Sequence, residues 1–558
     1  MSVSRQQWAR VTTLGRWLPW ALTALIPLAF LAIFFVLPVF GLVSRGFHDG
    51  DTWTLSNVTA VLSSTRTWRI IRQTLLFAVS GTCCTVLLGV PGAYVLYRLR
   101  LPGQRVWRVM ASVPFVLPSV VVGVAFKSLL APNGLLGFLE LDGSPVAIIA
   151  ALVFFNYSVV VRTVGAFWAG LDVKQVEAAR SLGASPFRAF TTVTLRALTP
   201  AIMSAAALVF LFCASAFGVV LVLGGSRYGT VETEIWYQTT ALLNLPAAAA
   251  LSIVQLVIVV VSLSLSNVAR THQERALRLA GRTTERSLTL TDVPALVVTV
   301  LTMGLLLVAP LATLLWRSLQ TRNGFGFGNY ALLATTANGS LSVSVWQAAL
   351  NSLLTGAVAM LLAVTLGAAV SYLLSRRPTS IWGHALLRSL DSAFMLPLGV
   401  SAVTVGFGFL ITLNRPPLDL RTSWVLIPIA QAIVALPLVV RTLLPTWRAI
   451  DPKLWEAAAT LGATEGRILR TIDLPLLLRS LGLAVGFAFA TSLGEFGATS
   501  FLSRPDRPTL PVVVYKLISR PGVDNLGMAL AAAVVLALLT GVVMAVAELL
   551  SKGEESGW

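Results

Sequence analysis

Long apolar stretches separated by short polar segments run through the whole sequence. Each stretch has roughly 20 residues or more, enough for a helix to cross a hydrocarbon layer about 30 Å thick. The short alternating segments typical of membrane β-barrels do not dominate anywhere. We therefore predict an all-α, polytopic membrane protein with about 12 transmembrane helices. The expected spans lie near residues 17–43, 72–97, 108–130, 145–168, 198–224, 247–267, 293–316, 347–374, 385–413, 422–445, 476–502 and 526–550.

The second half of the chain repeats the first at an offset of 279 residues, half of the 558-residue length. Residues 172–184 recur as residues 451–463, and single residues keep the same register over about a hundred positions. Such pairs include Phe115 with Phe394, Pro118 with Pro397, Arg162 with Arg441, Trp168 with Trp447 and Phe217 with Phe496.

We predict a six-helix repeat at 1–267, a cytoplasmic connector at 268–292 and a second six-helix repeat at 293–558. Because each repeat has an even number of spans, both start on the same side of the membrane. The two parallel repeats should then be related by a pseudo-two-fold axis along the membrane normal, with a path between them.

Composition and charge support a membrane location. Hydrophobic residues make up 56% of the chain and charged residues 11%, and the mean hydropathy is +0.82, values that a soluble domain would not tolerate. The net charge of +18 follows from Lys and Arg in alternate loops, which predicts that those loops and both termini are cytoplasmic. This basic excess needs no nucleic-acid partner. The basic residues include Arg5, Arg10, Arg16, Arg98, Arg100, Lys174, Arg278, Arg282, Arg376, Arg377 and Lys453.

The sequence offers no catalytic or metal-binding cluster. Cys83, Cys84 and Cys213 fall inside apolar spans, and the histidines are scattered over different loops. The phosphate-binding loop of nucleotide hydrolases is also missing. The first apolar segment is too long for a signal peptide, so we interpret it as a membrane span. We expect a transporter subunit rather than an enzyme, with no cofactor bound by this chain.

The repeated loop predicts a short capped helix in each half. Asp172 and Asp451 suit the N-cap, where a carboxylate accepts free backbone amides. Gly183 and Gly462 suit the left-handed position that ends a helix, about ten residues later. Such a helix is too short to be stable alone, so it needs a surface to pack against. It could be an amphipathic anchor at the lipid headgroups, but repetition of the same residues favours a protein partner.

This loop resembles the EAA loop of permease subunits of binding-protein-dependent ABC importers of type I. The second half carries every position of that motif, and the first half has Arg196 where Pro475 stands in the second. The motif residues, in loops 172–200 and 451–479, are Glu177, Ala178, Ala179, Gly183, Glu456, Ala457, Ala458 and Gly462. The resemblance implies that both loops couple the chain to a cytoplasmic ABC ATPase dimer, which uses ATP and Mg. It also implies an extracytoplasmic substrate-binding protein and a bacterial plasma (inner) membrane.

The arrangement of two permease repeats in one chain is similar to that of the permeases of thiamine and ferric-iron importers, and it resembles the thiamine type most. Gly494-Glu495-Phe496-Gly497 also resembles molybdate and sulfate permeases, which remain an alternative. A twelve-helix secondary carrier of the major-facilitator kind is the rival from another class. It would need several intramembrane acids for ion coupling, and Glu495 is the conspicuous one here.

Five further residues are candidates for transport. Glu495 and Asn156 could line the path, although each could instead hydrogen-bond a neighbouring helix. Trp236, Tyr237 and Tyr515 could dock the binding protein, although an interfacial aromatic belt would explain them equally well.

Overall fold

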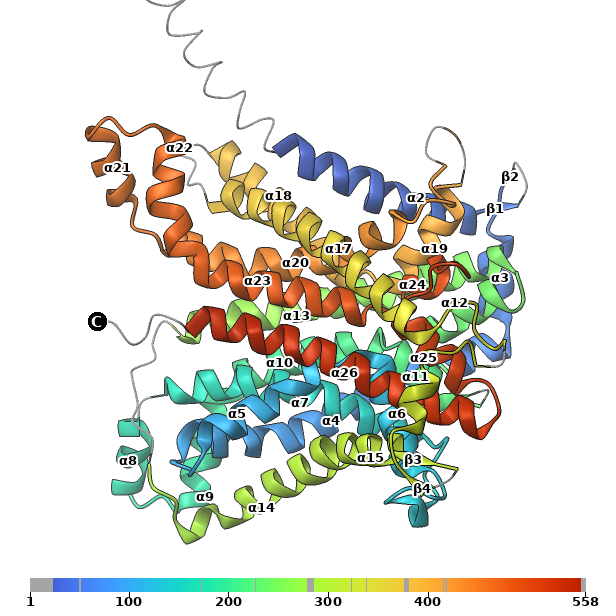
Figure 1. Ribbon diagram of the computed structural model, residues 1–558. Helices are drawn as coiled ribbons and strands as arrows, with labels where there is room; N and C mark the ends of the chain where they lie inside the picture. Colours follow the sequence, from blue (N-terminus) through green and yellow to red (C-terminus); the bar gives the residue numbers. More distant parts are fainter. Residues whose placement is uncertain are drawn as a thin grey trace, which may run out of the picture. The chain divides into compact units, whose positions relative to one another are not determined.

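A computed structural model describes residues 24–49, 52–171, 173–225, 227–277, 286–322, 324–337, 339–375, 381–414, 416 and 419–552 (Figure 1). Within these ranges nearly all regular structure is helical, and the strands form two short hairpins. These hairpins are β1 (His48–Asp49) with β2 (Thr52–Trp53), and β3 (Gln320–Thr321) with β4 (Gly324–Phe325). The predicted all-α class is confirmed.

The described residues hold 10 helices that are long and apolar enough to cross a membrane, or 11 if one bent pair counts as a span. They are Ala24–Gly46, Thr65–Arg98 (α4), Pro145–Ala169 (α7), Pro186–Ala214, Leu245–Ser264, Leu290–Ser318, Val345–Ser375 (α17), Leu426–Ala449 (α20), Gly466–Gly494 and Val523–Leu549. Helix α13 (Leu245–Leu277) and helix α26 (Val523–Lys552) each extend beyond the last span of their own repeat. A polytopic membrane protein is thus confirmed, with slightly fewer unbroken spans than predicted.

The third segment of each repeat is broken, so neither predicted span, 108–130 or 385–413, is one continuous helix. In the first repeat α5 (Gln104–Ser112) leads through η2 (Val113–Phe115) to α6 (Ser119–Leu130). In the second, α18 (Ile381–Gly399) and α19 (Ala402–Thr412) meet at an angle of 89°. Pro118 has extended backbone angles at the break, and a proline cannot donate the amide bond that would continue a helix.

The fifth span of each repeat lies earlier than the predicted ranges 198–224 and 476–502. It ends at Ala214 and Gly494, and a short helix follows in each repeat, α11 (Gly218–Gly224) and α24 (Thr499–Leu502). At its other end each span begins inside the repeated loop, with a short α-helix and a π-helical turn. The pieces are α9 (Pro186–Ala189), η4 (Phe190–Thr194) and α10 (Leu195–Ala214), then α22 (Glu465–Ile468), η7 (Leu469–Asp473) and α23 (Leu474–Gly494).

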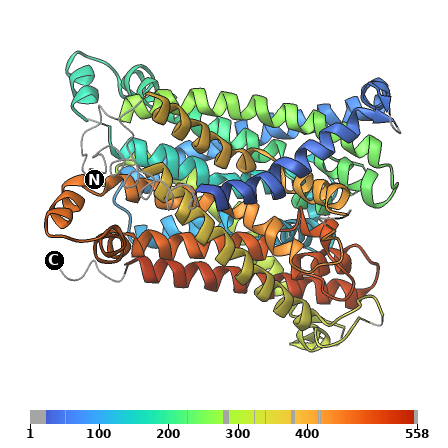
Figure 2. The same ribbon diagram turned by 90° about the horizontal axis from the view of Figure 1, so that it is seen from above.

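Shorter helices lie between these spans. They are α3 (Ser56–Ser63), η3 (Gly137–Leu139), α8 (Val173–Ser181), α12 (Val231–Thr240), α16 (Gly328–Leu332), α21 (Pro452–Thr460) and α25 (Leu510–Ile518). The first span contains η1 (Ala32–Val36) and α2 (Leu37–Gly46), and the span at 290–318 contains η5 (Leu290–Asp292), α14 (Val293–Thr302), η6 (Met303–Val308) and α15 (Ala309–Ser318). Within each compact unit the long helices run side by side (Figure 2).

Two compact units exchange the first helices of the repeats. Unit 1 comprises residues 1–44, 347–510 and 538–558, and unit 2 comprises residues 45–346 and 511–537. In unit 1 Leu31 and Phe35 pack into a core with Phe409 and Ile433. In unit 2 Met303 and Leu307 pack into a core with residues of α4, α7 and α10. The first helix of each repeat therefore packs against helices of the other repeat.

The predicted connector is partly helical. Helix α13 continues to Leu277, and residues 278–285, with Arg278 and Arg282, lie outside the described residues. Arg5, Arg10, Arg16, Arg376 and Arg377 also lie outside them. Beyond the gap, the backbone of Arg286 is bonded to both neighbours of Leu99, at the end of α4. The chain between the repeats is thus attached to the first repeat before the next span begins.

Candidate functional site: the repeated loops and the membrane residues

Helices α8 and α21 are the short helices that the repeated loop predicts, and each has nine residues. Asp451 caps α21 as expected, because its side chain accepts the N–H of Lys453 at 3.0 Å. Pro452 follows in the first turn, where its missing N–H breaks no helical bond. Asp172 lies outside the described residues.

Both helices end in the same left-handed turn. Gly183 has φ +87° and Gly462 has φ +81°, which side chains other than glycine rarely adopt. In each loop the glycine N–H and the next N–H reach back to helix carbonyls. Gly183 and Ala184 donate to Arg180 and Ala179, and Gly462 and Ala463 donate to Ala459 and Ala458. These paired bonds form a Schellman motif, so the predicted role of both glycines in ending the helix is confirmed.

The same π-helical turn leads from each loop into the membrane span. Turn η4 (Phe190–Thr194) and turn η7 (Leu469–Asp473) occupy equivalent positions at the offset of 279 residues. Arg196 and Pro475 are both second residues of the α-helix that follows. The missing proline in the first repeat therefore leaves the course of the helix unchanged. Both repeats therefore enter this span through the same π-helical turn.

The motif residues lie on the surface of these loops. Glu177, Ala178, Glu456 and Ala457 are exposed, and Ala179 and Ala458 are half-buried. Within each of these two loops, the most exposed apolar side chain is a leucine that is not among the motif residues named above. Leu182 is 90% exposed and its repeat equivalent Leu461 is 88% exposed. In the sequence, the signal that could have identified them is that both loops have a leucine directly before the glycine that ends the helix.

The two loops differ in how they are attached to the membrane helices. The indole N–H of Trp455 in α21 donates to the buried Asp473 in η7 at 2.7 Å. Trp455 also packs against Trp447, Ile450 and Leu477. The first repeat has Val176 and Thr194 at the positions of Trp455 and Asp473. A polar bond thus attaches the second loop to its span where the first loop has an aliphatic side chain.

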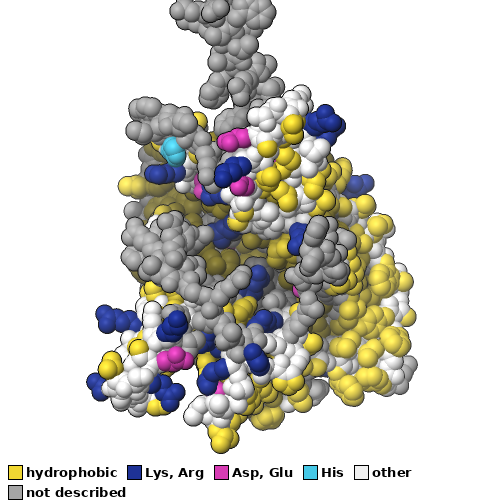
Figure 3. Space-filling view, turned by 90° about the vertical axis from the view of Figure 1, so that its left-hand side faces the viewer, with side chains coloured by type: hydrophobic (Ala, Val, Ile, Leu, Met, Phe, Trp, Pro, Cys, Tyr) yellow, Lys and Arg dark blue, Asp and Glu magenta, His cyan; other side chains and the backbone are white. Residues whose placement is uncertain are grey.

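In the view of Figure 3, Lys and Arg side chains outnumber acidic side chains on the described surface. One basic residue, at the end of the predicted connector, is held by a buried acid. Arg286 pairs with Asp292 at 2.6 Å, and the Tyr94 hydroxyl donates to the same carboxylate at 2.6 Å.

Glu495 lies between α23 and α24 and is buried. Both of its carboxylate oxygens accept backbone amides, from Ala498 at 2.7 Å and Thr499 at 3.0 Å. The hydroxyl of Thr499 in turn donates to the carbonyl of Glu495 at 2.8 Å. The side chain therefore caps the start of α24, and this capping accounts for a carboxylate buried in an apolar region.

Asn156 is buried in the middle of α7. Its amide donates to the carbonyl of Leu152 at 2.9 Å and lies 3.4 Å from the sulfur of Cys213 in α10. The amide group thus links two packed helices, the second of the two roles weighed for it from sequence.

The three aromatic candidates lie in α12 and α25. The rings of Trp236 and Tyr515 meet edge to face with centroids 5.8 Å apart, and both side chains are half-buried. Tyr237 is exposed and lies under the guanidinium of Arg66, 5.3 Å from its ring centre. Arg66 also pairs with Glu234 at 3.0 Å. The structure brings Trp236 and Tyr515 together and leaves Tyr237 facing solvent.

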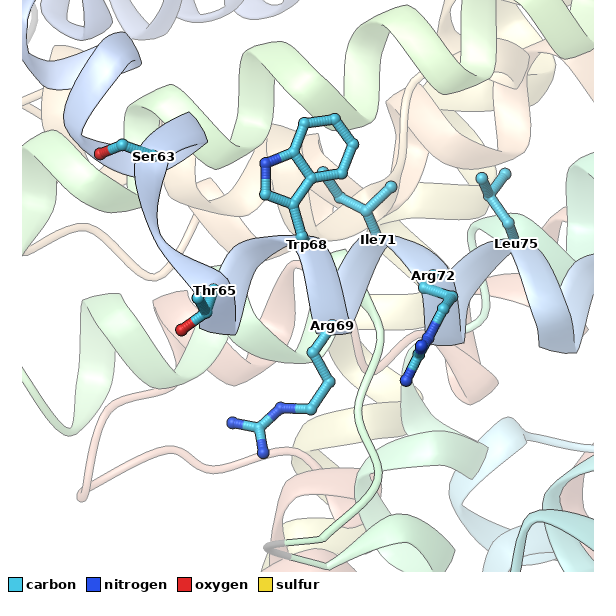
Figure 4. A pocket seen from close by; sticks show the side chains of 7 residues that line it. All are labelled: Ser63, Thr65, Trp68, Arg69, Ile71, Arg72 and Leu75. Atoms are coloured by element: carbon cyan, nitrogen blue, oxygen red, sulfur yellow. The ribbon is translucent and has the colours of Figure 1, made fainter.

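An open cavity of about 600 Å³ lies where α3 meets α4 (Figure 4). Its lining includes Trp68, Ile71 and Leu75 on one side of α4, and Arg69 and Arg72 on the other. In the described part of the chain neither of these two guanidiniums has an ion-pair partner. Within unit 2 this cavity lies at the end away from α8 (Figure 1). Sequence analysis did not identify it.

Among the described residues no group of three or more His, Cys, Asp or Glu side chains is arranged to hold a metal ion. The described cysteines are free thiols. The features that stand out are therefore the exposed loop of each repeat, the hydrogen-bonded polar groups buried among the helices, and the aromatic and cationic groups near the start of α4 and in α12.

Comparison with known proteins places the first of these loops within a transport family. Residues 85–279, which include α8, match the family described as "Binding-protein-dependent transport system inner membrane component". The thiamine transport system permease protein ThiP of Brucella suis is 27% identical over 86% of this chain and 87% of its own length. A probable ABC transporter permease protein of Sinorhizobium fredii is 25% identical over 98% of both chains.

A shorter relative shows higher identity. The molybdenum transport system permease protein ModB of Escherichia coli is 36% identical over 32% of this chain and 82% of its own length. All three relatives are named as permease proteins, so the chain is a transport subunit and not an enzyme. The two repeats and the helical fold agree with these relatives. The chain belongs to the inner-membrane permease components of binding-protein-dependent ABC importers.

Proposed function

We propose that this chain forms the complete membrane path of an ATP-driven importer, and that α8 and α21 dock with a cytoplasmic ABC ATPase dimer. The observation that carries this proposal is the repeated loop. Two helices at equivalent positions end in the same Schellman turn and expose the same leucine, Leu182 and Leu461. A pair of equivalent docking helices fits a partner that is itself a dimer, because each helix can then meet one ATPase subunit.

ATP and Mg are used by that partner and not by this chain. The two repeated loops, the connector and both termini face the cytoplasm, and the protein lies in a bacterial plasma (inner) membrane. The basic surface around α8 and α21 supports this orientation. When the ATPase dimer closes on ATP, it moves the two loops, and their π-turns pass the movement to the spans that follow. The repeats then expose the path to the two sides of the membrane in turn.

An extracytoplasmic binding protein delivers the passenger at the opposite end. Tyr237 is the exposed member of the three aromatic candidates, and it lies beside Arg66 in a surface that a protein could cover. The rings of Trp236 and Tyr515 are less exposed and pack against one another between α12 and α25. The cavity with Arg69 and Arg72 adds unpaired positive charge at this end, which suits an acidic patch on the binding protein.

We propose thiamine as the passenger, with ferric iron as the second candidate. The alignment with a thiamine permease covers most of both chains, whereas the molybdenum permease aligns with less than half of this one. The loop around Glu495 belongs to this path in our proposal, and acts through the turn that its carboxylate caps. Asn156 supports the path from the first repeat by linking α7 to α10.

Uptake in reconstituted vesicles tests the proposal. The chain would be purified with its ATPase, inserted into lipid vesicles and supplied with the binding protein, labelled thiamine and internal ATP. We expect thiamine uptake that needs both ATP and the binding protein. Uptake of ferric iron or molybdate under the same conditions, without thiamine uptake, would replace the passenger and leave the transport role intact. Uptake without an ATPase would contradict the role itself.

A further inference from the structure

Trp236 and Tyr515 are equivalent residues of the two repeats, and they touch one another. They lie 279 residues apart in sequence, at the offset that relates the repeats, and their ring centroids are 5.8 Å apart at an interplanar angle of 88°. Both residues lie in unit 2, so the ring pair is a direct contact between equivalent residues of the two repeats within that unit.

The helices that carry the two rings are held in equivalent ways. The N–H of Val231, at the start of α12, donates to the hydroxyl of Thr74 in α4 at 3.0 Å. The N–H of Leu510, at the start of α25, donates to the hydroxyl of Ser352 in α17 at 2.7 Å. Val231 and Leu510 are again equivalent residues, and both are fully buried. Each ring is thus fixed to the second span of its own repeat, so the rings separate if those spans move apart.

We propose that Trp236 and Tyr515 form an aromatic gate that closes the outer end of the path. This inference rests on the proposed function, because a gate requires a path through the membrane. Helix α12 lies at the end of unit 2 away from α8, which is the outer end if α8 meets the ATPase (Figure 1). A contact between equivalent residues of the two repeats at this end blocks the passenger until the rings separate.

The chemistry of the pair suits a contact that is broken in every cycle. An edge-to-face pair of rings excludes water, yet adds only a small attraction beyond the burial of its surface. In addition, the indole N–H of Trp236 is buried without an acceptor among the described residues. A buried donor without an acceptor disfavours the closed arrangement, and it gains an acceptor when water or a passenger reaches it. The closed gate is therefore not deeply stable.

Disulfide cross-linking in the complete transporter tests the gate. In a background with Cys83 and Cys84 changed to Ser and Cys213 to Ala, the double variant Trp236→Cys with Tyr515→Cys would be oxidised and the linked peptides measured by mass spectrometry. We expect efficient cross-linking in the complex without nucleotide, and a large decrease when a non-hydrolysable ATP analogue and the binding protein are added. The matched control is Tyr237→Cys with Tyr515→Cys, which should cross-link poorly because Tyr237 is exposed and lies outside the ring pair.

The cross-linked gate should block thiamine uptake, and reduction of the disulfide should restore it. Cross-linking that leaves uptake unchanged, or that does not respond to nucleotide, would overturn the gate while the parent complex remained active. An inactive parent complex would instead argue against the proposed function.

Because cysteines could disturb folding, Trp236→Phe with Tyr515→Phe provides a second variant. The Phe pair keeps two rings and should retain uptake. Trp236→Ala with Tyr515→Ala should instead make vesicles leak a small dye in the absence of ATP. Vesicles that stay tight with the Ala pair would overturn the gate.

Discussion

Leu182 and Leu461 occupy the same position in the two repeats, and each projects almost entirely into solvent, 90% and 88% exposed. Each stands directly before the left-handed glycine that ends its helix. A single exposed leucine needs no explanation, but two at equivalent positions on two docking helices indicate a surface that is covered in the working complex. This pair provides the most direct way to test the ATPase contact.

Changing both leucines should weaken binding of the ATPase. Burial of one leucine side chain is worth roughly 1.5–3 kcal/mol, so Leu182→Ser with Leu461→Ser should lower the affinity by at least about tenfold. Pull-down of the ATPase from detergent solution, over a range of concentrations, measures the effect. The control is Leu135→Ser, which removes another exposed leucine, from the loop before η3. Equal binding by the paired variant and the control would count against docking at these helices.

Alanine at the two helix-ending glycines should uncouple the transporter. The positive φ angles of Gly183 and Gly462 cost a residue with a side chain about 1–2 kcal/mol each, so the ends of α8 and α21 should shift or fray. We expect Gly183→Ala with Gly462→Ala to retain ATP hydrolysis and lose most of the uptake for each ATP consumed. Gly466→Ala is the control, because Gly466 lies in the same loop with open space around it and no positive φ. A loss of coupling in the control as well would show that the loop tolerates no change, and would remove the argument from φ.

The Arg286–Asp292 pair should contribute measurably to stability. Asp292 is buried and Arg286 is half exposed, so Arg286→Gln leaves a buried carboxylate with fewer partners, at a cost of about 1–2 kcal/mol after allowance for solvent screening. Thermal unfolding in detergent measures the shift. The matched control is Arg322→Gln, which removes an exposed partner of Asp524 and should change stability by less than about 1 kcal/mol. Equal shifts for both variants would contradict the account of the connector as an attached segment.

Substitutions at Glu495 should separate capping from charge. Glu495→Ala removes the acceptors of two buried amides, which should cost about 1–2 kcal/mol and lower uptake. Glu495→Gln keeps one carbonyl acceptor and the side-chain volume, so we expect it to retain most of the uptake. Assembly with the ATPase should be unchanged in both variants. If Glu495→Gln folds normally but transports as poorly as Glu495→Ala, the negative charge itself contacts the passenger.

The class of the protein and its repeated loop could be predicted because they depend on local sequence. Apolar length predicts spans, and Asp451, Pro452 and Gly462 act within one turn of their own position. The breaks after Phe115 and after Gly399 were missed because an apolar run hides a change in helix direction. Proline was the available signal, but it also occurs within continuous helices such as α4 and α20.

The exchange of first helices and the contact of Trp236 with Tyr515 could not be read from sequence in the same way. Both depend on which surfaces pack together over long sequence distances, and an apolar helix such as Ala24–Gly46 fits several such surfaces equally well. The role of Glu495 was likewise open, because its burial was predictable but its bonds to Ala498 and Thr499 depend on the turn that follows α23. The repeat offset identifies equivalent residues, and only the fold shows which of them meet.

Photo-cross-linking from the two leucine positions tests the central claim most directly. A photoreactive amino acid would replace Leu182 or Leu461 in the full-length chain, and the intact complex would be irradiated in native membranes. The account predicts an adduct with the ATPase subunit from each position, and none from the same group placed at Leu135. Adducts with lipid alone from both loops, or labelling of both by an impermeant reagent added outside the cell, would contradict it.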